Sequence, residues 1–364
     1  MSGPPRPAPP ARPATGRLAA LALAVGGAAL AASLGGCLPS SQREMDRSVS
    51  AADSASAALA ASAPVDTLAV VWSATPAEPL DLPTSLGWYR GGVAVVETEG
   101  GAARLFGADG AEAGRIDLGG GYPYLAGVRG DTVVALARGA DALRWAVPGR
   151  GVVRVLPVPP GASAALVTGS VVAVRTGGGA GEASGRVEVL DGRGGVRAVH
   201  PVAGPPWRAV GFLRDWGGRT VALSGYRPVV DVLDPAARPG VPLDTLALEG
   251  FASPQLARSA QFVRGDVDAP PLLTSSAAPL GDRLFVLNLR ADHVRVDVYG
   301  RAGRLERVLV SPGRSEEVYP LDLAVRERGG AVQLAVLLAR PPGLLQAPAS
   351  RVVLYEWAPR PVPV

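Results

Sequence analysis

Few residues in this 364-residue chain could perform chemistry. There is one cysteine, Cys37, and there are two histidines, His200 and His293, which lie too far apart in the sequence for the short spacings of zinc ligands. A single cysteine cannot form a disulfide within the chain, and no G-x-S-x-G motif is present. We therefore expect no metal site, no cofactor and no catalytic pair among these residues.

Acidic residues give little support for a metal site. Asp322 is the clearest acid on a predicted innermost strand, but one carboxylate does not supply the six to eight oxygens that Ca²⁺ prefers. Asp266 and Asp268 lie in an RGDVD stretch that could bind a cation locally or could be a solvated loop. The solvated loop is the simpler interpretation.

Aromatic residues are the most informative group. Six of the thirteen Trp and Tyr residues lie close to the predicted starts of innermost strands: Trp88, Tyr89, Tyr122, Tyr124, Trp207 and Tyr319. Arg90, Arg208 and Asp215 flank them and could orient a polar ligand. If the innermost strands surround a channel, these side chains share one face around its mouth, where they offer apolar area with a polar tip that suits ligand binding. The alternative is that they pack between neighbouring sheets.

The N-terminus carries an export signal. Arg6, Arg12 and Arg17 precede an uncharged apolar run at 18–34, which is too short and too rich in Ala and Gly for a typical membrane span. The run ends in Leu34-Gly35-Gly36-Cys37, which resembles the lipobox of bacterial lipoproteins. The resemblance implies removal of residues 1–36, lipidation of Cys37 and attachment to a membrane. A plain secretory signal or a single membrane anchor remains an alternative.

The resemblance also bears on location. Lipidation implies an extracytoplasmic protein, and Leu38 stands where an Asp commonly retains lipoproteins of Gram-negative bacteria in the inner membrane. The outer membrane is therefore expected if the host is Gram-negative. Residues 37–65 are rich in Ser and Ala and contain no aromatic residue, so we expect a flexible tether. Beyond the signal, acidic and basic residues are nearly balanced, which argues against nucleic acid as a partner.

Residues 66–364 predict an all-β domain made of repeats. The 47 Gly and 35 Pro residues favour many turns between short strands. A unit of four strands recurs, and its apolar second strands begin close to six positions: Val93, Val133, Val171, Val221, Leu284 and Val332. Units of about 40–50 residues with four strands are typical of β-propeller blades. A pair of β-sandwiches is the alternative.

The ends of the chain predict how the ring closes. The last unit lacks a fourth strand, because only Pro-rich sequence follows Trp357, and an unmatched strand at 67–74 precedes the first unit. We expect this strand to complete the sixth blade, which removes two exposed sheet edges. Segment 249–280 is predicted to be a long insertion and a second candidate recognition loop.

The repeats resemble NHL-like and related six-bladed propeller families. The similarity is clearest in Tyr122-Pro123-Tyr124, Tyr319-Pro320-Leu321 and Val298-Tyr299-Gly300. It implies a fold and not an activity. We expect a non-catalytic binding or scaffold protein of the cell envelope, with an unknown protein or small molecule as ligand. The alternatives are a lactonase-like or strictosidine-synthase-like hydrolase or lyase at the channel mouth, and a purely structural component of an envelope assembly.

Overall fold

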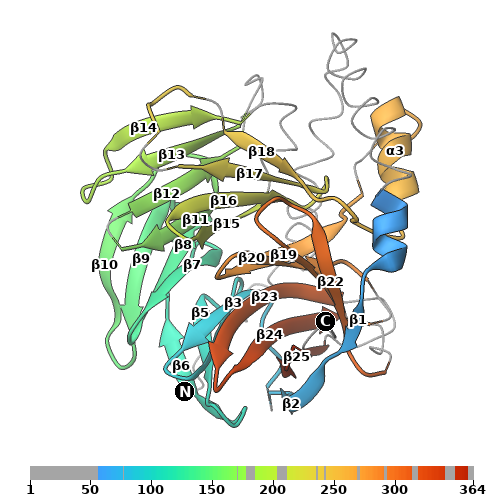
Figure 1. Cartoon of the computed structure of the whole chain (residues 1–364). Helices are drawn as coiled ribbons and strands as arrows, with labels where there is room; N and C mark the ends of the chain where they lie inside the picture. Colours follow the sequence, from blue (N-terminus) through green and yellow to red (C-terminus); the bar gives the residue numbers. More distant parts are fainter. Residues whose placement is uncertain are drawn as a thin grey trace, which may run out of the picture.

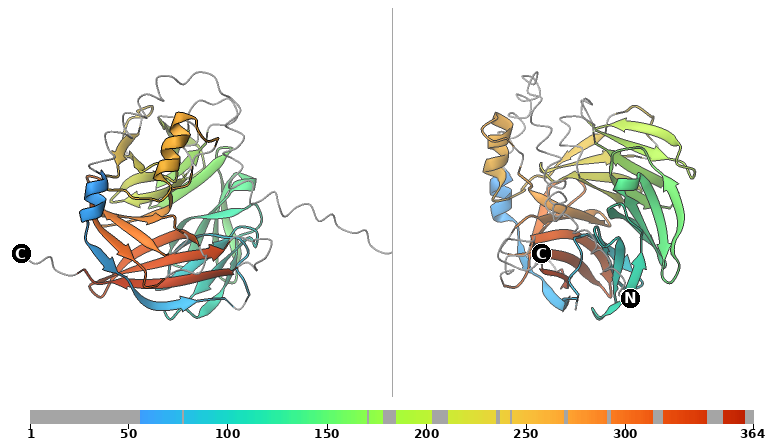
Figure 2. Two further views of the ribbon diagram at one scale, coloured as in Figure 1. Left: turned by 90° about the vertical axis from the view of Figure 1, so that its right-hand side faces the viewer. Right: turned by 180° about the vertical axis from the view of Figure 1, so that it is seen from behind.

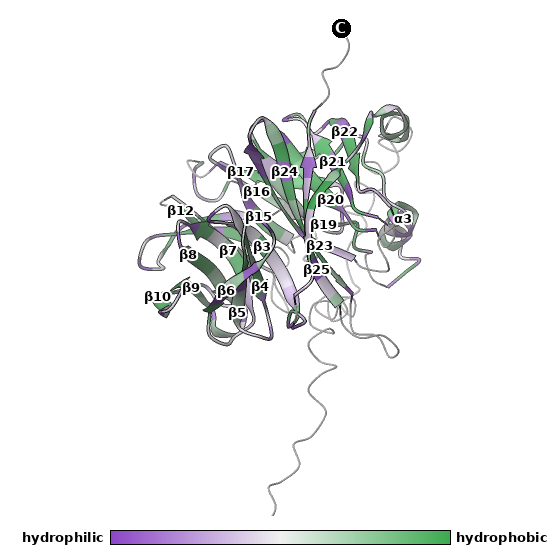
Figure 3. Cartoon of the chain, turned by 90° about the horizontal axis from the view of Figure 1, so that it is seen from below, coloured by the Kyte–Doolittle hydropathy of each residue, from purple (hydrophilic) through white to green (hydrophobic). Residues whose placement is uncertain are grey.

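Six β-sheets surround one axis, as the computed structural model shows (Figures 1 and 3). The structure describes residues 56–76, 78–169, 171–177, 185–202, 211–234, 237–241, 243–268, 271–290, 293–313, 319–340 and 349–359. The predicted signal segment, Cys37, Trp207 and Arg208 lie outside these residues. The predicted all-β fold with six blades is confirmed.

The first three blades each contain four antiparallel strands in chain order. Blade one consists of β3 (Pro83–Tyr89), β4 (Gly92–Glu97), β5 (Ala102–Phe106) and β6 (Glu112–Asp117). Blade two consists of β7 (Pro123–Arg129), β8 (Thr132–Ala137), β9 (Ala142–Val147) and β10 (Gly151–Pro157). Blade three consists of β11 (Ala162–Thr168), β12 (Val171–Thr176), β13 (Arg186–Leu190) and β14 (Val196–Pro201).

The other three blades follow the same plan, and the first two strands of the domain, β1 and β2, join the last two blades. Blade four consists of β15 (Gly211–Trp216), β16 (Arg219–Ser224), β17 (Val229–Leu233) and β18 (Asp244–Ala247). Blade five consists of β19 (Thr274–Leu280), β20 (Arg283–Asn288), β21 (Arg295–Tyr299) and β22 (Leu305–Val310), joined by β1 (Val65–Thr67). Blade six consists of β23 (Tyr319–Arg328), β24 (Ala331–Arg340), β25 (Ala349–Trp357) and β2 (Ala69–Ala74).

The N-terminal strand closes the ring as expected. β2 pairs antiparallel with β25, so a strand from the start of the domain completes the last blade. β1, one residue earlier, pairs in parallel with β22 of blade five, which the sequence did not predict. Leu68, between β1 and β2, is buried and packs in the core shared by blades five and six. The N-terminal segment therefore joins two neighbouring blades.

The folded domain begins earlier than the predicted boundary at residue 66. Residues 56–62 are helical, and Ser56 Oγ accepts a hydrogen bond from the amide of Gly250 at 2.8 Å. Leu59 and Ala63 pack in a cluster with Phe251 and Leu305. The expectation of a flexible tether at 37–65 is therefore wrong for residues 56–65, because their small and apolar side chains pack against the propeller.

The predicted insertion is also shorter than expected. Residues 274–280 of the segment 249–280 form β19, the innermost strand of blade five. The remainder includes α3 (Leu256–Arg264), which lies beside the helix at 56–62 along one edge of the ring (Figure 2). The insertion thus packs with the N-terminal helix outside the ring of blades.

The core lies between successive blades. The second strands are apolar without alternation, and all six residues of β4 are buried, because both faces of these strands are covered by other sheets. Close packing requires glycine at one inner position: a Cβ on Gly127 of β7 would lie 2.7 Å from the carbonyl oxygen of Val167 in β11. No helix among the described residues is long and apolar enough to span a membrane.

Candidate functional site

The six innermost strands define two ends of the ring axis. The Leu125 amide near the start of β7 donates to Ser85 Oγ near the start of β3 at 2.9 Å, and the Leu86 amide donates to Asp322 Oδ2 in β23 at 2.8 Å. The innermost strands therefore run in the same direction, with their first residues at the same end of the ring axis. We call the end where β3, β7, β11, β15, β19 and β23 begin the strand-start face, and the opposite end the strand-end face.

Three of the predicted aromatic residues lie at the strand-start face. Tyr122 directly precedes β7 and is 52% exposed, and Tyr319 is the first residue of β23 and is 38% exposed. Tyr124 is the second residue of β7 and is partly buried. This part of the predicted constellation thus occupies one end of the axis.

Trp88, Tyr89 and Arg90 lie at the other end, so the expectation that the whole set shares one face is wrong. Residues 83–89 are themselves the innermost strand of blade one, which places Trp88 and Tyr89 at its end. The guanidinium of Arg326 in blade six stacks 3.8 Å from the centre of the Trp88 ring. Tyr89 is buried, and its hydroxyl donates to the carbonyl of Asp131 in blade two at 3.4 Å. These aromatic residues pack between neighbouring blades.

The two flanking polar residues that the structure describes are also at the strand-end face. Arg90 occupies the turn between β3 and β4 with a φ of 46° and forms an exposed ion pair with Asp131 at 3.4 Å. Asp215 lies near the end of β15, where its carboxylate accepts the Gly218 amide at 3.1 Å. Neither residue is placed to orient a ligand at the strand-start face.

Arg138 is a residue of the strand-start face that sequence reasoning missed. It begins the short 3₁₀ helix η2 (Arg138–Ala140), which follows the second strand of blade two. Its guanidinium stacks 3.4 Å from the centre of the Tyr124 ring and donates to the backbone carbonyl of Ser163. The backbone of η2 is held by the Gly139 amide, which donates to Gly121 at 2.8 Å. No motif marks Arg138, because its position depends on how η2 pairs with the segment before β7 and on its side chain reaching the start of blade three.

The Arg138 guanidinium is partly buried. Burial lowers the pKa of Arg138, and among the described residues no carboxylate forms an ion pair with it. Its Nε–H is buried and donates no hydrogen bond to any of the described residues. A charge withdrawn from water without a counter-charge is costly, so this group is suited to receive an anion.

A buried carboxylate links the inner strands near the axis. Asp322 is fully buried, and its Oδ1 accepts hydrogen bonds from Arg214 at 2.9 Å, from Ser276 and from the Leu323 amide. Its Oδ2 accepts the Leu86 amide. These four contacts, three on Oδ1 and one on Oδ2, join blades one, four, five and six. Asp322 therefore links the inner strands of four blades.

The remaining residues of chemical interest are dispersed. His200 is fully buried in β14, with Nδ1 3.2 Å from the carbonyl oxygen of Val241. Asp266 and Asp268 follow α3 and are exposed or partly exposed. Across the described ranges, no three His, Cys, Asp or Glu side chains gather as a metal site would need.

Comparisons with known proteins show the fold. No protein-family model and no curated protein matches the chain. Among solved structures, the calcium-binding protein regucalcin from Agrobacterium tumefaciens matches 82% of this chain and 97% of its own, at 11% identity and a TM-score of 0.51.

Two further solved structures match less closely. A streptogramin B lyase matches 80% of this chain and 87% of its own, at 9% identity and a TM-score of 0.48. The glutaminyl cyclase of Myxococcus xanthus matches 81% and 99%, at 12% identity and a TM-score of 0.40. Identities this low carry no activity from one protein to another. What this chain shares with regucalcin is the six-bladed propeller fold.

Proposed function

We propose that this protein is a lipid-anchored, extracytoplasmic propeller that binds an anionic ligand at its strand-start face without changing it chemically. The observation that carries the binding proposal is the Arg138 guanidinium, which is stacked on Tyr124 and has no carboxylate partner among the described residues. The anchor rests on Leu34-Gly35-Gly36-Cys37. The ligand is a small molecule or a protein segment that carries a carboxylate or a phosphate.

The geometry favours anion recognition for two reasons. Stacking on Tyr124 and the bond to the Ser163 carbonyl hold the Arg138 fork in one orientation, so little side-chain entropy remains to be lost on binding. Tyr122 is exposed beside it, and Tyr319 is exposed at the same face in blade six; both offer apolar area with hydroxyl tips. An incoming carboxylate would supply the counter-charge that the site lacks.

The described residues favour binding over the alternative of a hydrolase or lyase. Such an enzyme needs a side chain that is free to act as base or nucleophile. Asp322 and Ser276 are the acid and hydroxyl that meet on the axis, but they are buried and already hydrogen-bonded to each other and to Arg214.

The binding proposal is tested by replacing the charge at Arg138. The purified protein and its Arg138→Gln variant are titrated with citrate, acetate and inorganic phosphate, and the thermal unfolding temperature is followed. We expect an anion to stabilise the parent protein and to lose most of that effect in the variant. Arg219→Gln is the matched control, because Arg219 is exposed at the start of β16 in blade four.

The stability of Arg138→Gln without an anion distinguishes a binding role of Arg138 from a purely structural one. Arg138 has no carboxylate partner among the described residues, so removing its partly buried charge should leave stability unchanged or raised, even though the bond to Ser163 is weakened. A large loss of stability in Arg138→Gln, with no anion effect in the parent protein, would mean that Arg138 is only a clamp between blades two and three.

The anchor has its own test. Cells that express the protein are fed an alkyne-tagged fatty acid, and we expect the label on the parent protein but not on Cys37→Ser. Equal labelling of both proteins, or labelling of neither, would contradict lipidation at Cys37. Membrane fractionation of the same cells would then show which membrane holds the protein.

A further inference from the structure

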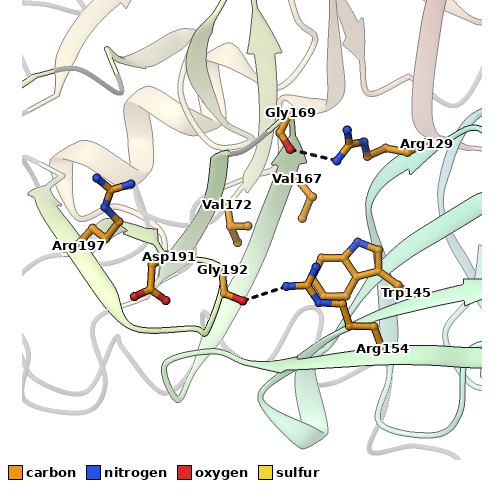
Figure 4. A pocket seen from close by; sticks show the side chains of 9 residues that line it. All are labelled: Arg129, Trp145, Arg154, Val167, Gly169, Val172, Asp191, Gly192 and Arg197. Carbon is orange, nitrogen blue, oxygen red and sulfur yellow. Dashed lines mark hydrogen bonds between the residues drawn. The ribbon is translucent and has the colours of Figure 1, made fainter.

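A second site lies between blades two and three at the strand-end side of the ring. A cleft of about 380 Å³ opens there beside the end of β7 and the turn after β11 (Figure 4). Its walls carry Arg129, Arg154, Arg197 and Trp145, with one acid, Asp191. The volume falls in the range of small-molecule pockets.

The cleft is electropositive. Its three arginines come from β7, β10 and β14, and among the described residues none of them forms an ion pair with a carboxylate. The Asp191 carboxylate is held within its own hairpin, where Oδ1 accepts the backbone amides of Arg193 at 2.8 Å and Gly195 at 2.9 Å. These backbone hydrogen bonds lower the pKa of Asp191. Three positive charges thus face one carboxylate that is already occupied by backbone donors.

The strand register places a cation on an aromatic ring at the cleft. A bulge between Val152 and Arg154 shifts the pairing of β10, so that Arg154 lies opposite Trp145 of β9. The guanidinium of Arg154 stacks 4.4 Å from the centre of the Trp145 ring and donates to the carbonyl of Gly192 in blade three at 2.9 Å (Figure 4). Arg129 donates across the same seam to Gly169 at 3.1 Å.

Both guanidinium groups are therefore oriented before a ligand arrives. Each has used one donor across the seam and keeps further N–H groups for a ligand. Gly194 allows the hairpin of blade three to lie close to blade two, since a Cβ there would lie 2.5 Å from the carbonyl oxygen of Pro157 in β10. Val167 and Val172 supply an apolar wall.

We propose that this cleft binds a small organic anion in which a phosphate or carboxylate is attached to a flat apolar body. The anionic group would pair with the guanidinium of Arg154 and that of Arg129 or Arg197, and the apolar body would lie against the valines and the edge of Trp145. The site is distinct from the strand-start face, since Arg129 is the last residue of β7 and its acceptor Gly169 follows the end of β11.

The test is calorimetric titration of the purified full chain with phenyl phosphate and benzoate. Inorganic phosphate provides the anion without the ring, and benzyl alcohol provides the ring without the anion. We expect a phenyl anion to bind at one site more tightly than either fragment, with an affinity that falls as salt is raised. Arg154→Gln should weaken this binding about tenfold or more, and Arg154→Lys should restore it only in part.

Two control variants make the result specific. Arg219→Gln, in blade four, should leave the titration unchanged. Arg138→Gln removes the anion site proposed at the strand-start face, and it should leave the tighter binding of the phenyl anion in place. If phenyl phosphate and benzoate show no binding up to about 10 mM, or bind Arg154→Gln as tightly as the parent protein, the proposal is wrong. Binding that is lost in Arg138→Gln and kept in Arg154→Gln would assign the anion to the strand-start face and would also overturn it. Unfolding curves of each variant establish that the fold is retained.

Discussion

The Asp322 carboxylate in the last blade accepts the Leu86 amide of the first blade at 2.8 Å. It thereby joins the two ends of the ring at the axis, while β2 joins them at the periphery by pairing with β25. The same carboxylate reaches Arg214 and Ser276 in blades four and five. Four inner strands thus meet at one side chain, in a closed fold whose other blade contacts are mostly apolar.

Replacing Asp322 should therefore destabilise the whole propeller. In Asp322→Ala the buried amide of Leu86 loses its acceptor and Arg214 loses its counter-charge. Breaking a buried ion pair by removing one partner costs about 3–5 kcal/mol, and we expect the lower end because the Arg214 side chain is 21% exposed. Chemical denaturation measures the change.

The control for Asp322 is Asp282→Ala, which removes an ion pair with Arg301 between two exposed side chains. That change should cost less than about 1 kcal/mol. If the two substitutions have similar effects on the free energy of unfolding, Asp322 does not hold the ring together.

Closure by the N-terminal segment gives a second prediction. Leu68 is 1% exposed. Two residues earlier, Asp66 Oδ2 accepts hydrogen bonds from the guanidinium of Arg307 in blade five at 2.7 Å and from the indole N–H of Trp357 in blade six at 2.8 Å. Leu68→Ala should destabilise the protein by about 2–5 kcal/mol, as for other large-to-small core changes. Val70→Ala, at an exposed position of β2, should change the free energy of unfolding by less than about 0.5 kcal/mol. Urea denaturation of both variants checks this, and equal effects would contradict a closing role for Leu68.

The sequence predicted the middle strands of the blades well and the innermost strands poorly. Second strands such as β4 and β24 are runs of Val, Leu and Ala that are buried on both faces, so their pattern is readable without knowing the fold. Innermost strands face the axis and carry small or polar residues. β19 reads TSSAAPL, which has no β-branched aliphatic residue, so the sequence pattern places it in the insertion at 249–280.

The candidate site shows the same limit. The pattern predicts Trp88 and Tyr89 close to the start of an innermost strand, whereas residues 83–89 are themselves the innermost strand β3 and both residues lie at its end. Arg138 and the cleft around Arg154 depend on which loops and blades meet in space, and neither leaves a local pattern in the sequence. The position of the closing strand could be predicted because an unmatched strand at one end and a missing strand at the other are both local observations.

Glu97 predicts a pH dependence of stability. It is buried at the end of β4, and burial raises its pKa above the ordinary value of 4.5, against the lowering effects of the Asp81 amide and of Arg104. The folded protein therefore holds a proton on Glu97 more tightly than the unfolded chain does. The contribution of this group to stability is fully present below about pH 4.5 and is lost as pH rises through the folded pKa.

Comparison with Glu97→Gln isolates this contribution from other titrating groups. The free energy of unfolding of the parent protein, minus that of the variant, should fall between about pH 4 and pH 7. Urea denaturation at several pH values measures the difference. A difference that rises with pH would mean that the ion pairs with Arg104 and Arg115 outweigh burial.

Two substitutions at Tyr122 distinguish backbone strain from ligand binding at the strand-start face. Its φ of 55° lies in the left-handed region, which costs a non-glycine residue about 1–2 kcal/mol, and its ring is 52% exposed, so little packing offsets that cost. Tyr122→Gly removes both strain and ring, whereas Tyr122→Ala keeps the strain and removes the ring. We expect Tyr122→Gly to be more stable than Tyr122→Ala by about 1 kcal/mol, and both to bind the anion recognised through Arg138 more weakly than the parent protein. Thermal unfolding with and without that anion gives both quantities. If both variants bind as the parent protein does, Tyr122 is a turn residue only, and recognition at this face is left to Arg138, Tyr124 and Tyr319.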